Sequence, residues 1–491
     1  MEPTVKPTLV EQPGIIEQAL YEVRKKIYPR AVHGNFALWR WIFVYLTQLV
    51  FYGGPWLQWN GRQAVLFDLA QRKFYIFGLV FWPQDIVYLT VLLIISAYSL
   101  FLFTAVAGRL WCGFACPQTV YTEIFMWIER KVEGERLARM KLDQQPLSPR
   151  KFTRKAIKHG LWIALSLWTG FTFVGFFTPI TTLGHDVLAL HTGPWESFWM
   201  LFYGFATYGN AGWLREQVCK YMCPYARFQS VMFDPDTLII TYDTERGEPR
   251  GARARSADRK SKGLGDCVDC GICVQVCPTG IDIREGLQYE CIGCAACIDG
   301  CDQVMDKMGY PKGLIRYSTE NALKQHLPAQ GILKRIFRPR VLVYTAVLWA
   351  IIIAALVTLY QRVPLKVDVI RDRGNVMHDA EDDAVQNVYR LQIMNTQEIA
   401  RDLRISVSGL DGIAIRGASR LIPVAPASSV AVALRVEAPR ESGHEGSNRI
   451  LFTVEAIDPA HPDGTVLKIV EKASFVIPEK RSGHEHESEH D

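Results

Sequence analysis

Two runs of four cysteines lie in the middle of this 491-residue chain, and their spacing points to metal chemistry. In each run, two residues separate the first three cysteines from one another, and three residues precede the fourth. The runs are Cys267, Cys270, Cys273 and Cys277, then Cys291, Cys294, Cys297 and Cys301. A cubane of iron and sulfide needs one thiolate for each iron atom. This spacing, present twice, therefore predicts two [4Fe–4S] clusters.

The spacing also predicts which cysteines share a cluster, because the last cysteine of each such run ligates the cluster of the other run. The expected ligands of cluster I are Cys267, Cys270, Cys273 and Cys301, and those of cluster II are Cys291, Cys294, Cys297 and Cys277. Zinc is an alternative, but it prefers two separated pairs of ligands. A disulfide framework would need an oxidising compartment.

Four further cysteines form two copies of a second motif, Cys-x-x-x-Cys-Pro. They are Cys112 and Cys116, before Pro117, and Cys219 and Cys223, before Pro224. Residues four apart share a face of a helix, so each pair should present its thiols in one direction. Four converging thiols would suit Cu(I) or a third iron–sulfur centre, or act as redox-active dithiols; the alternative is buried packing at a helix end. Met126 and Met222 lie near these motifs in the sequence. Their thioethers could bind copper, or the side chains could simply contribute to packing.

Five segments are apolar over about 20 residues, the length that spans a bilayer. Membrane helices are therefore expected to position these thiols. The segments are Phe36–Trp56, Asp85–Ala107, Gly160–Thr178, Trp195–Trp213 and Pro339–Tyr360. Arg40, near the start of the first segment, is expected to snorkel outward. The stretch Phe74–Trp82 is too short to span and is expected at the interface or in a hairpin.

Lysine and arginine predict the orientation, since they concentrate in cytoplasmic loops. The arm 1–35 is basic and polar, with no cleavable signal peptide, and the connection 130–158 is densely basic, whereas Pro179–Pro194 contains no lysine or arginine. This pattern predicts a bacterial inner-membrane protein with its N-terminus and cysteine sites in the cytoplasm, and with everything after Tyr360 in the periplasm. The concentration of lysine and arginine in cytoplasmic loops, together with attraction to anionic lipid, explains the net charge of +5. Nucleic-acid binding is therefore not expected.

The expected fold is a multi-domain membrane protein. It combines an α-helical transmembrane bundle of five spans, an inserted two-cluster ferredoxin-like domain and a C-terminal all-β immunoglobulin-like sandwich. Alternating apolar and polar residues, separated by turn signals such as Asp411-Gly412, predict the strands of the sandwich. The expected domains are an N-terminal arm (1–35), four spans with both Cys-x-x-x-Cys-Pro motifs (36–245), a flexible linker (246–265), the ferredoxin domain (266–325), the fifth span (339–360), the sandwich (363–480) and a disordered His-rich tail (481–491).

With these residues in view, the chain resembles the cytochrome c oxidase accessory protein family of the FixG/RdxA/CcoG type over nearly its whole length. The resemblance rests on the outer sandwich and on the segments Trp111–Pro117, Cys219–Phe228, Cys291–Cys297 and Gly313–Tyr317. It implies a membrane-bound polyferredoxin that is needed to assemble a cbb-type haem–copper oxidase and reduces Cu(II) to Cu(I). The implied partners are membrane lipid, a cytoplasmic electron donor, copper ion, copper-delivery proteins and the oxidase subunits, and a homo-oligomer is left open.

Three functions stay open at this point. The first is a cupric reductase with Cys112, Cys116, Cys219 and Cys223 as the catalytic residues of a copper or third redox site. The second is a quinol-linked respiratory electron-transfer subunit, and the third is a non-redox scaffold for oxidase assembly. The sequence contains no nucleotide or flavin fingerprint, so the electrons must come from another molecule.

Overall fold

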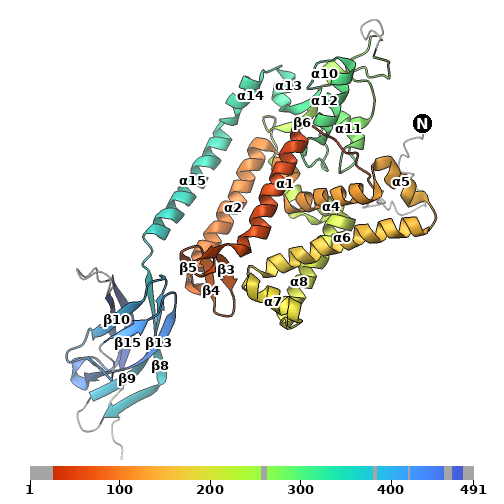
Figure 1. Cartoon of the computed structure of the whole chain (residues 1–491). Coiled ribbons are helices and arrows are strands. Elements are labelled where there is room, and N and C mark those ends of the chain that lie inside the picture. The colour runs from red at the N-terminus through yellow and green to blue at the C-terminus, as the bar shows by residue number, and fades with distance from the viewer. Residues whose placement is uncertain (1–25, 256–262, 380–383, 418–420, 458–466, 479–491) are drawn as a thin grey trace, which may run out of the picture. The chain divides into compact units, whose positions relative to one another are not determined.

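The computed structural model describes residues 26–255, 263–379, 384–417, 421–457 and 467–478 (Figure 1). The chain divides into two compact units. The cysteine unit contains residues 1–41, 107–161 and 214–328, and therefore all twelve cysteines; the helix–sandwich unit contains residues 42–106, 162–213 and 329–491. Most of the predicted N-terminal arm (1–25) and the predicted His-rich tail (481–491) lie outside the described residues.

In the cysteine unit, short helices alternate with the loops that carry the cysteines. The helical elements are α3 (Leu110–Phe114), α4 (Pro117–Glu133), α5 (Arg136–Gln144), the first part of α6 (Pro149–Val174), the π-helical turn η4 (Val218–Met222), α9 (Pro224–Met232), α10 (Thr244–Gly247), α11 (Ile272–Gln275), η5 (Ile283–Glu285), α12 (Ala296–Met308) and α13 (Glu320–Lys324). Strands β6 (Ile239–Tyr242) and β7 (Ile315–Ser318) pair antiparallel. Because β6 precedes the ferredoxin cysteines and β7 follows them, this pairing ties the two ends of the ferredoxin segment together.

The predicted linker is not free where the structure describes it. Arg246 forms an ion pair with Asp266 at 2.6 Å. Arg253 donates hydrogen bonds to the carbonyl of Gly265 at 2.6 Å and to that of Cys267 at 3.2 Å. A flexible linker is therefore wrong for residues 246–255, because their arginines bind the ferredoxin segment; residues 256–262 lie outside the described part.

Two helices of the helix–sandwich unit are long and apolar enough to cross a membrane. They are Pro83–Ala107, which contains α2 (Ile86–Ala107), and α15 (Pro339–Tyr360). The other predicted spans are helical but do not meet this standard among the described residues: α1 (Asn35–Gly53) carries Arg40, α6 starts with a basic stretch, and α8 (Pro194–Thr207) gives way to the π-helical turn η3 (Tyr208–Leu214). These three spans stay predictions.

Smaller elements connect the long helices of this unit. They are η1 (Gly54–Trp56), β1 (Gln58–Trp59), β2 (Arg62–Gln63), β3 (Val65–Asp68), β4 (Lys73–Ile76), β5 (Leu79–Phe81), η2 (Pro83–Asp85), α7 (Ile180–Ala189) and α14 (Ala329–Ile336). Strands β3, β4 and β5 form an antiparallel sheet in that order. The stretch Phe74–Trp82 thus forms the expected hairpin.

The C-terminal part consists of two four-stranded antiparallel sheets. The strands are β8 (Leu365–Asp379), β9 (Ala384–Asn395), β10 (Arg401–Ser408), β11 (Ala414–Arg416), β12 (Ile422–Val424), β13 (Ser429–Pro439), β14 (Gly446–Ile457) and β15 (Leu467–Ile477), with the short turn η6 (Arg440–Ser442). The sheet orders are β12-β10-β14-β15 and β11-β13-β9-β8. Alternate residues of β14 are buried, as expected for a strand with one face on a core.

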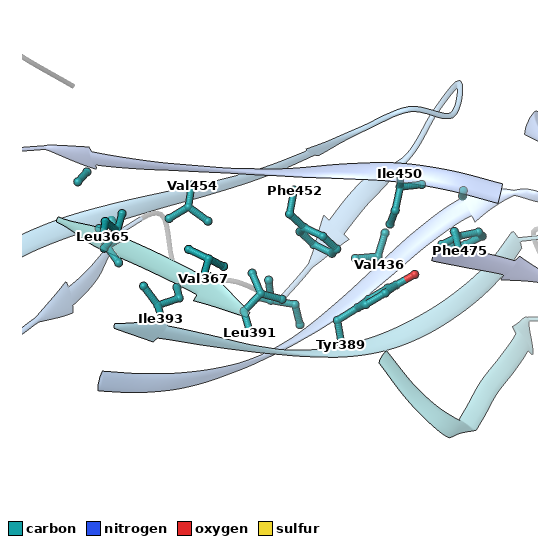
Figure 2. Close-up of a cluster of buried hydrophobic side chains, with 14 of the residues drawn as sticks. Leu365, Val367, Tyr389, Leu391, Ile393, Val436, Ile450, Phe452, Val454 and Phe475 are labelled. Atoms are coloured by element: carbon teal, nitrogen blue, oxygen red, sulfur yellow. The ribbon is translucent and has the colours of Figure 1, made fainter. Parts of the chain in front are cut away.

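One hydrophobic core is shared by both sheets (Figure 2). Tyr389 and Leu391 come from one sheet and Phe452 and Phe475 from the other, and all four are fully buried. The rings of Tyr389 and Phe452 meet edge to face with centroids 5.1 Å apart, a favoured aromatic arrangement. The Tyr389 hydroxyl donates a hydrogen bond to the carbonyl of Ser474 at 2.8 Å, so its polar end is also satisfied.

Replacing Phe452 with alanine should destabilise this core by about 3–5 kcal/mol, because the buried ring is lost and a cavity is left. The matched control is Val470→Ala in the same sheet, since Val470 is 46% exposed and little packing is lost. Limited proteolysis of the purified full-length protein, with mass spectrometry of the fragments from residues 365–477, measures the difference. Equal protease resistance of the two variants would contradict this packing.

Candidate metal centres

Two pockets in the cysteine unit bring the eight ferredoxin cysteines together. The first is lined by Cys267, Cys270, Cys273 and Cys301. The second is lined by Cys277, Cys291, Cys294 and Cys297, and Cys273 reaches it as well. Each pocket therefore combines three cysteines of one run with the last cysteine of the other; this is the grouping that the crossed assignment requires, and the ligation itself stays a prediction. Leucine, isoleucine, valine and methionine supply much of the remaining lining, which keeps the thiols in apolar surroundings.

The backbone repeats the same shape around the second cysteine of each run. Asp269 and Gly271 flank Cys270 with φ values of 48° and 62°, and Gly293 and Ala295 flank Cys294 with φ values of 68° and 59°. Residues that alternate between left- and right-handed conformations turn their N–H groups to one side and form a nest that binds anions, including iron–sulfur centres. Helices α11 and α12 begin directly after these turns.

Burial holds several of these thiols in the protonated form when no metal is bound, because a buried thiolate is poorly solvated. It raises the pKa of Cys273 to about 11 and that of Cys291 to about 12. Burial also raises the pKa of Cys301 to about 12 and that of Cys297 well above its ordinary value. A metal centre would displace these protons, since thiolate is the ligand form.

All twelve cysteines are free thiols, so the disulfide alternative has no support. Among the described residues, no group of three or more His, Cys, Asp or Glu side chains is arranged around a single metal ion. Cysteines that hold a cubane need not surround one ion, because each binds a different iron atom of the cube. The donor set, the apolar lining and the backbone nests fit [4Fe–4S] clusters better than a mononuclear zinc site.

The two Cys-x-x-x-Cys-Pro motifs do not lie on continuous helices. Cys112 is in α3 and Cys219 in the π-helical turn η4, whereas Cys116 and Cys223 are extended residues, with ψ values of 129° and 111°, that precede α4 and α9. The expectation of one helical face per motif is therefore wrong. The physical reason is the proline that follows each second cysteine, because it disfavours helical geometry in the residue before it.

The thiols of the two motifs nevertheless lie near one another, although no three of them surround a single metal position among the described residues. Burial and the nearby thiols of Cys116, Cys112 and Cys223 together raise the pKa of Cys219 to about 12. Burial, followed by the nearby Cys116, raises the pKa of Cys112 to about 11. Each motif therefore lies within electrostatic range of the other.

The first motif also touches the cluster II loop. A Cβ atom added at Gly113 would lie 2.7 Å from the Cα of Cys294 and 2.7 Å from the carbonyl oxygen of Gly293. Only glycine fits this backbone-to-backbone contact without a shift. Cys112 and Cys219 also pack against the buried residues Ile292 and Cys294. The four-thiol set and the second pocket are therefore neighbours.

Arg109 links the three segments that meet here. Its guanidinium donates to the carbonyl of Tyr289 at 2.5 Å and, more weakly, to that of Cys291 at 3.4 Å. It also donates to the carbonyl of Ala226 at 2.6 Å, just after the second motif, and lies 5.0 Å from the centroid of the Tyr289 ring. Arg109 is buried and three residues before Cys112. One cation therefore connects both motifs to the loop of Cys291.

Arg40 faces the cluster II cysteines instead of snorkelling. It is only 8% exposed, and its buried Nε has no hydrogen-bond partner. Arg40 forms a loose ion pair with Glu123, with 3.9 Å between the charged groups. The charge of Arg40 also lies within electrostatic range of Cys294. The predicted outward position is therefore wrong. A buried cation of this kind suits a neighbouring cluster, because thiolate-ligated clusters are anionic.

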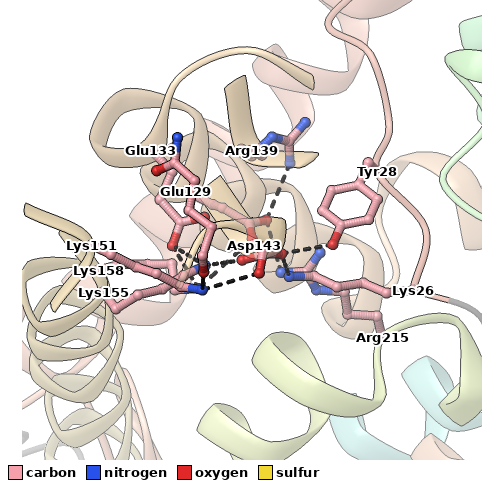
Figure 3. Close-up of polar contacts among 11 residues, drawn as sticks. Lys26, Tyr28, Glu129, Glu133, Arg139, Asp143, Lys151, Lys155, Lys158 and Arg215 are labelled. Atoms are coloured by element: carbon pink, nitrogen blue, oxygen red, sulfur yellow. Dashed lines mark hydrogen bonds and ion pairs between the residues drawn. The ribbon is translucent and has the colours of Figure 1, made fainter. Parts of the chain in front are cut away.

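A buried network of charges supports this arrangement (Figure 3). Glu129 of α4 forms ion pairs with Arg139 at 3.2 Å and with Arg215 at 3.0 Å, and Glu133 pairs with Lys158 at 2.9 Å. Burial alone would raise the pKa of Glu129, but Arg215 and the other cations hold it below its ordinary value. Since α4 follows the first motif and Arg215 precedes Cys219 by four residues, the network holds both motifs in position.

Sequence reasoning missed Arg109, Gly113 and this network. Acidic and basic residues at helical spacing in α4 are typical of a solvated or interfacial face, so their burial had no clear sequence signal. The one available signal was Glu129 and Glu133, four residues apart on one helical face and near a dense run of lysine and arginine.

Comparison with known proteins gives three matching family models. Residues 214–320 match a 4Fe–4S dicluster domain, residues 89–134 match a 4Fe–4S binding domain, and residues 355–478 match the IG-like fold at the C-terminal of FixG. These matches support iron–sulfur clusters and the expected immunoglobulin-like C-terminal fold.

Full-length relatives agree with the family models. The chain is 36% identical to the nitrogen fixation protein FixG of Rhizobium meliloti, over 94% of both chains. It is 37% identical to the protein RdxA of Cereibacter sphaeroides, over 94% of this chain and 99% of RdxA, and 38% identical to RdxB of the same organism, over 82% and 86%. This chain therefore belongs to the FixG/RdxA-type family of 4Fe–4S ferredoxins and is an iron–sulfur electron-transfer protein.

Proposed function

We propose that this protein is a membrane-bound cupric reductase, which converts Cu(II) to Cu(I) for the assembly of a cbb-type cytochrome c oxidase. The observation that supports the proposal is the contact of Gly113 with Gly293 and Cys294, because it brings the first Cys-x-x-x-Cys-Pro motif against the loop of cluster II, where Cys112 and Cys219 also pack. Thiolates bind Cu(I) well. An electron carrier with a soft-metal site beside it is what reduction of copper requires.

The electron balance is simple. When bound, the two clusters supply one-electron transfer from a donor to copper. Cu(II) gains one electron to become Cu(I), and a reduced one-electron carrier protein of the cytoplasm loses one. Cys270 is exposed, whereas Cys294 is buried. The donor would therefore dock near the first pocket, and copper would bind beyond the second.

The four thiols of the Cys-x-x-x-Cys-Pro motifs are the proposed copper ligands and catalytic residues. Cys112, Cys116, Cys219 and Cys223 are all partly buried. Each would release its proton when it binds the metal, since thiolate is the ligand form. The eight remaining cysteines are the proposed cluster ligands, with Cys277 and Cys301 exchanged between the runs.

The proposed location is the bacterial inner membrane, with the cysteine unit in the cytoplasm and the strands after Leu365 in the periplasm. The distribution of lysine and arginine supports this orientation. The C-terminal sheets would then face oxidase subunits or copper-delivery proteins. A docking role is the simplest one for them, since their polar surface has no cysteine.

A third iron–sulfur centre is the second candidate for the four-thiol set. The 4Fe–4S binding model over residues 89–134 favours it, because that segment contains Cys112 and Cys116 but no ferredoxin cysteine. Iron analysis separates the candidates: two clusters bring about eight iron atoms per chain, and three bring about twelve.

The central test gives Cu(II) and dithionite to anaerobically purified protein and measures Cu(I) with a chromogenic chelator, against dithionite with Cu(II) alone. Wild-type protein should accelerate Cu(I) formation, and Cys219→Ala should lose about tenfold or more of this rate, because a soft ligand is removed. Cluster content by EPR should be unchanged. Full activity of Cys219→Ala, or oxidation of a quinol without any reduction of copper, would refute the proposal.

Gly113→Ala tests the contact between the motif and the cluster II loop. The added Cβ would have to push aside backbone atoms 2.7 Å away, which costs about 1–3 kcal/mol and separates the two loops. Cu(I) formation should slow while both cluster signals persist. Gly160→Ala is the matched control, since a Cβ at Gly160 meets open space. A Gly113→Ala rate equal to that of the control would show that the contact does not matter.

Arg109→Gln tests the electrostatic part of the arrangement. Loss of the cation beside Cys291 should lower the midpoint potential of cluster II, because the more negative reduced state loses its stabilising charge. A shift of about 60 mV would correspond to a tenfold change in a one-electron equilibrium. EPR-monitored potentiometry measures it. Arg109→Lys, which keeps the charge but not the forked donors, should stay closer to the wild-type potential; equal shifts in both variants would point to a structural role only.

A further inference from the structure

A small pocket with a mixed lining of polar and apolar side chains lies between the second motif and the cluster II loop. Its volume is about 40 Å³, and its lining includes Met126 and Glu123 of α4, Glu216 and Cys219, and Cys294. Glu123 and Met126 are three residues apart and therefore share a face of α4. All of these residues belong to the cysteine unit. The pocket thus joins one of the four thiols of the two motifs to a ligand of the second cluster pocket.

The size of the pocket restricts its occupant. A buried water needs about 10–15 Å³ measured in this way, so 40 Å³ holds one ion with a few waters. Sites for drug-sized organic ligands measure about 300–1,000 Å³. The pocket is therefore smaller than a site of that kind.

The lining of the pocket includes donor atoms of the kinds that Cu(II) and Cu(I) prefer. Glu123 and Glu216 offer carboxylate oxygens, which suit Cu(II), and Cys219 and Met126 offer sulfur atoms, which suit Cu(I). The Glu123 carboxylate makes no hydrogen bond among the described residues, and the nearest cation, Arg40, is 3.9 Å away. Arg40 and Arg215 also line the pocket, but Arg215 pairs with Glu129, so the pocket carboxylates and the Cys219 thiolate would together supply negative charge for the ion.

The two methionines near the motifs differ in position. Met126 lines the pocket, whereas Met222 is 59% exposed and is absent from its lining. The pair therefore provides a ligand candidate and a matched control in the same chain. Both could be replaced by leucine, which keeps the approximate volume and removes the sulfur donor.

We propose that this pocket receives the copper ion and that the Met126 thioether binds it together with the Cys219 thiolate. This inference rests on the proposed function and adds a ligand outside the Cys-x-x-x-Cys-Pro motifs. Copper held here would lie beside Cys294. In the reductive step, Cu(II) takes one electron from the reduced carrier chain and stays bound as Cu(I), with no other bond broken.

The test is the Cu(I) affinity of the anaerobically purified full-length protein with its clusters, measured by competition with a chromogenic Cu(I) chelator. Met126→Leu should bind Cu(I) about tenfold or more weakly, equivalent to about 1.4 kcal/mol. Met222→Leu should match the wild type. X-ray absorption of the copper-loaded protein should show one fewer sulfur neighbour in Met126→Leu, a change that a packing defect would not produce.

The outcomes separate this inference from the proposed function. Wild-type affinity and an unchanged sulfur count in Met126→Leu, with copper reduction intact, would overturn the pocket assignment and leave the reductase proposal standing. An equal loss of affinity in Met222→Leu would also overturn it, because Met222 lies outside the pocket. Wild-type protein that neither binds nor reduces copper would overturn both.

Discussion

A contact between two backbones, at Gly113 and at Gly293–Cys294, joins the first Cys-x-x-x-Cys-Pro motif to the loop of cluster II. A Cβ on Gly113 would lie 2.7 Å from Cys294, and a Cβ on Gly293 would lie 3.1 Å from the backbone of Arg109. At each of these two glycines, the backbone of the other segment occupies the space that a side chain would need. Electron transfer weakens steeply with distance, so a contact of main chain on main chain is the shortest available link between the two cysteine sites.

The charges around this contact keep it in place at a considerable cost in solvation. Glu129 and Glu133 are buried, and so are their partners Arg139, Lys158 and Arg215. A buried ion pair adds little net stability, but removal of one partner costs about 3–5 kcal/mol because it leaves an uncompensated charge. The network therefore serves position more than stability. It fixes α4 and the turn before Cys219 relative to each other, and the four thiols can lie near one another only if these two elements are held.

The sequence predicted the parts of the site that depend on local spacing. The cysteine runs are short, so their ligands are limited by the reach of the chain, and the crossed grouping of Cys277 and Cys301 could be inferred in advance. Strands in the C-terminal sheets were visible because one face of each is buried, which imposes a period of two.

The parts that depend on tertiary contacts were missed. Burial of Arg40 and Glu129 contradicts the usual exposure of charged residues and is decided by partners far away in the chain. The prolines after Cys116 and Cys223 indicate the helix breaks, whereas the four-residue spacing of the cysteines taken alone suggests a continuous helix. Within the described residues, three of the five predicted spans do not form helices that are long and apolar enough to cross a membrane, so these spans stay predictions.

The two ferredoxin pockets and the pocket of Met126 and Cys219 differ in their lining. The two ferredoxin pockets are lined by cysteine and aliphatic side chains, and their buried thiols would be hard to deprotonate without a permanent metal. The pocket of Met126 and Cys219 has carboxylates and arginines as well as sulfur. Oxygen donors hold Cu(I) weakly, so such a mixed site can accept Cu(II) and still let Cu(I) go.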